Sequence, residues 1–115
     1  MPFKYKPSAS SVKPPPIDES GNAFGGDIVS TTDTNAASPI SAGYFRIEKG
    51  KPLVFEYEFD EAKLFLEGEC VVEDETGQKV TARTGDVFLF TKGSKISFST
   101  SNYALAFYCD QRAKL

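Results

Sequence analysis

The side chains most able to do chemistry in this chain lie in and next to one strand-like run, FDEAKLFLEGE at residues 59–69. Glu61 and Lys63 are two residues apart, so on a regular strand they share one face with Phe65. Tyr57, just before the run, adds a phenol hydroxyl as a third polar group. A lone buried charge is costly, whereas a paired carboxylate and ammonium are tolerated. The run therefore predicts three candidate catalytic residues, Tyr57, Glu61 and Lys63, suited to general acid and base chemistry.

The residue types do not favour a transition-metal site. The chain contains no histidine, and its two cysteines, Cys70 and Cys109, lack the spacing of a zinc site. Each cysteine is embedded in a strand-like run, so we interpret both as reduced packing residues. We expect no metal and no other cofactor, while oxygen ligands from acids or from a substrate remain an alternative.

Composition limits the classes of partner. The 115 residues suffice for one domain, and 40% hydrophobic residues with ten Phe and five Tyr supply an aromatic core. A net charge of −3 without a basic stripe argues against nucleic acid. No apolar run approaches the roughly 20 residues of a membrane span. We expect a cytoplasmic protein that forms a homodimer and binds neither nucleic acid nor membrane.

Most of the chain alternates with a period of two. In LVFEYEFD at residues 53–60, apolar and aromatic residues alternate with acids, which is typical of a strand with one buried face. Further candidate strands, separated mostly by Gly or Asn, are residues 27–30, 43–48, 62–75, 79–85, 86–93, 95–101 and 103–110. Seven or eight short strands predict an all-β, antiparallel sandwich or barrel.

The first 22 residues have a different composition. They are rich in Pro, Ser and Lys, and Pro14, Pro15 and Pro16 are consecutive. This composition favours an arm that is extended, disordered or laid along a partner subunit. We therefore expect an arm over residues 1–22 and a folded domain over residues 23–115.

Two spaced motifs resemble those of the cupin superfamily. Six residues separate Glu61 from Gly68, and Gly85 is followed by DVFLF and then by Thr91, Lys92 and Gly93. More narrowly, FDEAKLFLEGECVV and GDVFLFTKGSKISFS resemble the EutQ-like branch of small cupins, over about Ser41 to Cys109. The resemblance implies a cupin-type antiparallel jelly-roll β-barrel with an extended N-terminal arm.

The resemblance also locates the pocket. Counting along the motifs puts Phe55, Tyr57 and Ile96 where the family usually has metal-binding histidines. A barrel with these residues implies an aromatic-lined pocket in place of the usual metal site. The candidate ligand-binding residues are Phe55, Phe65, Ile96, Phe98 and Arg46. Arg46 lies on the face opposite Phe45 and Ile47, so we expect it at the surface or the rim, where it is a candidate for holding a substrate anion.

Three functions are compatible with these residues. The first is binding of a small organic molecule, with metal-independent lyase, isomerase or dehydratase chemistry as a further possibility. The second is a non-catalytic, dimeric structural or interaction module. The third is a metal-dependent cupin enzyme with oxygen ligands.

Overall fold

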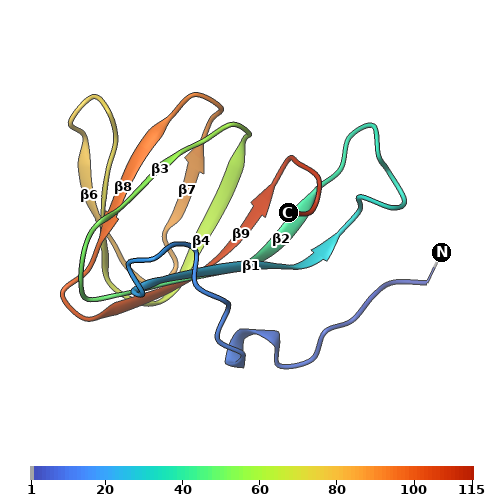
Figure 1. Ribbon diagram of the computed structural model, residues 1–115, viewed down its shortest axis with the longest axis horizontal. Helices are drawn as coiled ribbons and strands as arrows, with labels where there is room; N and C mark the ends of the chain where they lie inside the picture. The colour runs from blue at the N-terminus through green and yellow to red at the C-terminus, as the bar shows by residue number, and fades with distance from the viewer. Residues whose placement is uncertain (1) are drawn as a thin grey trace.

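The computed structural model describes residues 2–115, which fold almost entirely into strands (Figure 1). The strands are β1 (Ala23–Ser30), β2 (Ser41–Glu48), β3 (Leu53–Glu56), β4 (Glu61–Gly68), β5 (Cys70–Glu73), β6 (Lys79–Ala82), β7 (Val87–Phe90), β8 (Lys95–Ser99) and β9 (Tyr103–Asp110). The only helical segment in residues 2–115 is a short 3-10 turn, η1 (Ala9–Ser11). Within these residues, no helix has the length and apolar character needed to cross a membrane.

Two antiparallel sheets face each other. The larger has the strand order β1-β2-β9-β4-β7, and the smaller has the order β3-β8-β5-β6. Among residues 2–115 no strand pairing joins one sheet to the other, so they form two layers instead of one closed barrel. The predicted all-β, cupin-type jelly-roll fold is confirmed in this two-layered form.

The core lies between the two sheets, where alternate residues of each strand meet. Phe65 of β4 and Phe98 of β8 are almost fully buried, and Phe98 contacts Phe45 of β2 across the layers at a ring-centroid distance of 5.2 Å. This packing is the expected result of period-two alternation with one face turned inward.

The predicted continuous strand over residues 62–75 was wrong, because Gly68 divides it. β4 belongs to the larger sheet and β5 to the smaller one. Gly68 has φ +74°, and a Cβ there would lie 2.0 Å from the Tyr103 carbonyl oxygen. Only glycine allows the chain to change sheets in this conformation. The glycine of the first motif thus has a structural role in the fold.

The predicted strand over residues 53–60 is also shorter than expected, since β3 ends at Glu56. From there the chain is held by the turn that precedes β8: the Tyr57 amide donates to the Ser94 carbonyl, and the Gly93 amide donates to the Tyr57 carbonyl, both at 2.8 Å. The Lys92 amide donates to Asp60 Oδ1 at 2.9 Å. The turn of the second motif therefore fixes the position of Tyr57.

The last part of the N-terminal arm, at residues 15–17, reaches the edge of β1, while the beginning of the arm lies away from the sheet (Figure 1). The Gly25 amide donates to the Pro15 carbonyl, and the Ile17 amide donates to the Ala23 carbonyl, both at 2.9 Å. β1 therefore begins four residues earlier than the predicted strand, because its first half is paired on both sides, with the arm and with β2. These bonds cover part of an otherwise open sheet edge.

Replacing Gly68 by Ala is expected to lower the free energy of unfolding by about 3 kcal/mol or more, because the new methyl group would collide with backbone atoms. Gly77→Ala is the matched control: Gly77 also has a positive φ, +90°, but nothing lies within 4 Å of its Cβ position. There we expect only the conformational cost of about 1 to 2 kcal/mol. Urea unfolding of both variants measures the difference, and equal losses would contradict the proposed role of Gly68.

Candidate functional site

A cavity of about 500 Å³ opens between the two sheets at the edge of β1. Its walls are mainly apolar and aromatic, from Phe45, Leu53, Phe55, Phe59 and Phe98. The polar residues that line it are Asp27, Tyr44, Tyr57, Glu61, Lys63, Tyr108, Asp110 and Arg112, together with the exposed Lys13 and Lys114. Residues of the arm, including Pro15 and Ile17, close one side. A mostly apolar cavity with a few convergent polar groups is the usual form of a small-molecule site.

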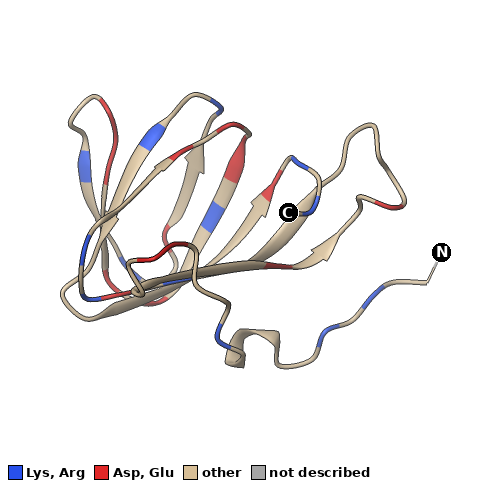
Figure 2. Cartoon of the chain, in the orientation of Figure 1, with Lys and Arg blue, Asp and Glu red and all other residues tan. Residues whose placement is uncertain are grey.

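Tyr57, Glu61 and Lys63 meet in this cavity. The Tyr57 hydroxyl donates to Glu61 Oε2 at 2.6 Å, and Lys63 Nζ lies 3.2 Å from the same oxygen. Lys63 Nζ also donates to the Tyr57 hydroxyl oxygen at 3.4 Å. Figure 2 shows the acidic and basic segments in succession along β4. The structure thus brings together the three candidate catalytic residues.

Aromatic rings surround the Lys63 ammonium. Nζ lies 4.1 Å from the ring centroid of Phe45, 4.4 Å from that of Phe98 and 5.7 Å from that of Phe90. The negative faces of these rings stabilise a cation that water cannot reach. Only 4% of the Lys63 side chain is exposed, so the rings and Glu61 replace its hydration.

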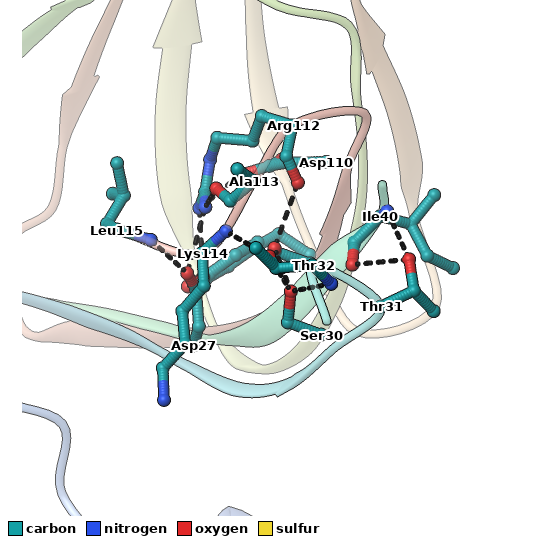
Figure 3. Close-up of polar contacts among 12 residues, drawn as sticks. Asp27, Ser30, Thr31, Thr32, Ile40, Asp110, Arg112, Ala113, Lys114 and Leu115 are labelled. Carbon is teal, nitrogen blue, oxygen red and sulfur yellow. Dashed lines mark hydrogen bonds and ion pairs between the residues drawn. The ribbon is translucent and has the colours of Figure 1, made fainter. Parts of the chain in front are cut away.

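A second polar cluster lies beside the first, around Arg112 (Figure 3). Arg112 Nη1 donates to Asp27 Oδ2 at 2.8 Å, and Nη2 donates to Asp27 Oδ1 at 2.9 Å. Nη2 also forms an ion pair with Asp110 Oδ2 at 2.7 Å. Tyr108 donates its hydroxyl to Asp27 Oδ1 at 2.7 Å. The cluster therefore ties the segment after β9 to β1 at the cavity.

Burial and neighbouring charges shift the pKa values of several of these groups. Burial, together with the charge of Glu61, raises the pKa of Tyr57. Burial, together with the hydrogen bond to Asp27, raises the pKa of Tyr108. Both phenols therefore act only as neutral hydrogen-bond donors or acceptors. For Asp27, burial is outweighed by hydrogen bonds from Arg112 and Tyr108, which hold its pKa below the ordinary value. Burial and the adjacent Glu61 raise the pKa of Asp110 to about 8.

The predicted ligand-binding residues are not all in the cavity. Phe55 and Phe98 line it, whereas Phe65 and Ile96 are buried in the core and do not. Arg46 lies outside the cavity: its Nε pairs with Glu48 Oε2 at 2.8 Å, and its guanidinium lies over the Tyr103 ring. The outward face expected for Arg46 is observed, and the groove next to it meets the cavity at the arm residues Val12, Lys13 and Pro14.

Sequence reasoning missed Asp27, Asp110 and Arg112 as site residues. Asp110 has the same strand parity as Tyr108, so β9 alternation could have placed it on the inner face. Asp27 and Arg112 gave no such signal. The strand predicted around Asp27 had only four residues, too few to show alternation, and Arg112 lies outside any strand. Their pairing joins residues 85 positions apart, which only the fold reveals.

The donor set does not fit the transition metal that the cupin fold often carries. Among residues 2–115, no group of three or more His, Cys, Asp or Glu is arranged to hold a metal ion. Tyr57 and Glu61 supply oxygen donors, but the Lys63 ammonium already lies against Glu61 Oε2. A metal cation at this oxygen would be repelled by that charge.

Comparison with known structures identifies similar folds. The Salmonella typhimurium LT2 protein described as ethanolamine utilization protein Q is 29% identical, with a TM-score of 0.66 over 80% of this chain and 71% of its own. The Clostridium difficile EutQ protein is 22% identical, with a TM-score of 0.68 over 81% and 70%. The polyketide cyclase RemF from Streptomyces resistomycificus is 13% identical, with a TM-score of 0.73 over 93% and 79%. No curated protein matches the chain.

The family match extends across nearly the whole chain. Residues 15–114 match the family described as ethanolamine utilisation protein EutQ. The match begins within the N-terminal arm, so it includes the segment that covers β1 as well as both sheets. It is wider than the resemblance over Ser41 to Cys109 that the two motifs carry. The chain belongs to the EutQ family.

Proposed function

We propose that this protein binds a small organic molecule in the cavity between its two sheets. The observation that carries the proposal is the convergence of Tyr57, Glu61 and Lys63 on one side of a cavity of about 500 Å³ with aromatic walls. Burying a carboxylate, an ammonium and a phenol together is costly unless they are fully paired, and a purely structural core would do without them. Their position at a cavity supports a role in contacting a ligand.

The same three groups support acid and base chemistry without a metal. Glu61 can take a proton from a carbon or hydroxyl of the bound molecule. Hydrogen bonds from Tyr57 and Lys63 can stabilise negative charge that develops on a neighbouring oxygen. Return of the proton to another carbon gives an isomerase, and its delivery to a leaving hydroxyl gives a dehydratase or lyase. The family name alone assigns no reaction, because one fold serves many chemistries.

The cell compartment expected from the sequence is part of the proposal. Cys70 and Cys109 are both free, and burial raises the pKa of Cys70 to about 11, so its thiol is inert at neutral pH. Two unpaired thiols suit a reducing compartment. We therefore propose that the protein is located in the cytoplasm and binds its ligand there.

The ligand proposal is tested by NMR screening of the full chain against a library of small organic molecules. Binders are expected to shift the resonances of Phe55, Phe59 and Phe98, which line the cavity. Phe55→Trp places a larger ring there and should abolish binding. Val54→Thr is the control. Val54 precedes Phe55 in the chain, but its side chain is exposed, so this change should leave binding unchanged. Binders that shift only resonances outside the cavity, or no binders at all, would contradict the proposal.

A specific surface also favours a homodimer. On β7, Val87 and Leu89 are 72% and 71% exposed, and they pair in register with Leu64 and Ala62 of β4. β7 is an edge strand of the larger sheet, so this outer face continues to a free backbone edge. The four side chains carry no charge that would select a different partner. We propose that a second copy of the chain covers this face in a two-fold symmetric dimer.

Leu89→Asp is expected to convert a dimer into a monomer with an unchanged circular dichroism spectrum, because a carboxylate would be buried without a partner in the interface. Val54→Asp is the matched control, since Val54 is 56% exposed on β3 of the other sheet. Light scattering after size-exclusion chromatography gives the mass. A monomeric wild type, or the same dissociation in both variants, would exclude this interface.

A further inference from the structure

Five charged side chains lie together at the cavity, and their charges do not cancel if all are ionised. The negative groups are Asp27, Glu61 and Asp110, and the positive groups are Lys63 and Arg112. No more than 11% of any of these side chains is exposed. Three buried carboxylates against two cations leave one uncompensated negative charge, which is strongly unfavourable out of water.

Glu61 and Asp110 are the two carboxyl groups that face each other. They are direct partners in the ladder between β4 and β9. Asp110 Oδ2 is paired with Arg112, but Asp110 Oδ1 is buried and has no hydrogen-bond donor among residues 2–115. An ionised oxygen in that position would bear the full cost of desolvation. A proton on Oδ1 makes it a donor to the neighbouring carboxylate instead.

The surroundings of Asp110 favour this arrangement. The titratable groups around it are Glu61 and Lys63 on β4, Tyr57 in the loop before β4, Asp27 on β1, Tyr108 and Cys109 on β9, and Arg112 after β9. Burial and the adjacent Glu61 carboxyl group raise the pKa of Asp110 and outweigh the opposite effect of Arg112. Two carboxyl groups in contact cannot both ionise readily.

We propose that Glu61 and Asp110 share one proton, which rests on Asp110 Oδ1 and is hydrogen-bonded to the Glu61 carboxylate. With this proton in place, two negative charges face two positive ones and the cluster is neutral. Asp110 is then a positioning residue that acts through Glu61: it holds a proton beside the group that exchanges protons with the ligand.

The neutral charge of the cluster also indicates the chemical class of the ligand, an inference that rests on the proposed function. Lys63 is paired with Glu61, and Arg112 is paired with Asp27 and Asp110, so the charge of each buried cation is already matched, and only Arg112 Nε lacks a hydrogen-bond partner. The carboxylates are likewise paired and do not attract a cation. The other cations that line the cavity, Lys13 and Lys114, are exposed to water, so an ion that reaches the buried cluster would lose its hydration without gaining a partner charge. The cavity therefore selects an uncharged molecule.

Carbon-13 NMR of the carboxyl carbons of the full chain tests the shared proton without any ligand. Asp110 Cγ is expected to titrate with a midpoint near pH 8. Asp74, which hydrogen bonds from Thr76 hold below its ordinary pKa, is the internal reference. Glu61→Gln removes the adjacent negative charge and should lower the Asp110 midpoint by about one unit or more. An Asp110 titration complete below about pH 5, or a midpoint unmoved by Glu61→Gln, overturns the inference.

Two probes of the same shape test the choice of an uncharged ligand: tert-butylbenzene and phenyltrimethylammonium. At about pH 6 wild type should prefer the uncharged probe by about tenfold or more, and at about pH 9.5 this preference should shrink as the shared proton leaves. The Asp110→Asn variant has no ionisable group at position 110, so its preference for the uncharged probe should not change with pH. A wild-type preference that does not change with pH overturns the ligand class. Binding of neither probe contradicts the proposed function, while the carboxyl titration still decides the shared proton.

Discussion

The structure depends on how it compensates charges buried between its two sheets. Lys63 and Arg112 are cations in an aromatic interior, and each is stable there only because carboxyl groups and ring faces replace water. These contacts also tie separate elements together: Lys63 and Glu61 come from β4, Tyr57 from the loop before it, and Asp27 from β1. The cavity keeps its shape because the groups that line it are bound to one another.

The glycines of the two motifs belong to the framework around this cluster. Gly68 allows the chain to pass between sheets, and the turn at Gly93 binds the backbone of Tyr57. Gly68 is needed for the close approach of the backbone, and Gly93 suits the positive φ of its turn. The hydroxyl of Tyr57 is then directed to Glu61. The same framework thus positions a paired carboxylate, ammonium and phenol at the cavity.

The sequence predicted the fold well because alternation and glycine spacing are local signals. It also predicted that Tyr57, Glu61 and Lys63 meet, since two of them share a strand face and the motif count placed the third. It could not predict which buried aromatic residues line the cavity: Phe65 and Ile96 follow the same alternation as Phe98, and only packing separates them. The contact of Asp27 with Arg112 was out of reach, because it joins the first strand to residues after the last.

The pH dependence of the unfolding free energy tests the buried charge cluster most directly. Asp110 has a pKa of about 8 in the folded protein and an ordinary value of 3.8, so between these values the folded state binds more protons than the unfolded state. Stability should therefore fall as pH rises from about 4 to 8, by up to about 1.4 kcal/mol per pH unit. Asp110→Asn should remove this slope. Wild-type stability that is flat or rises across this range, or a slope that Asp110→Asn leaves unchanged, would contradict the account.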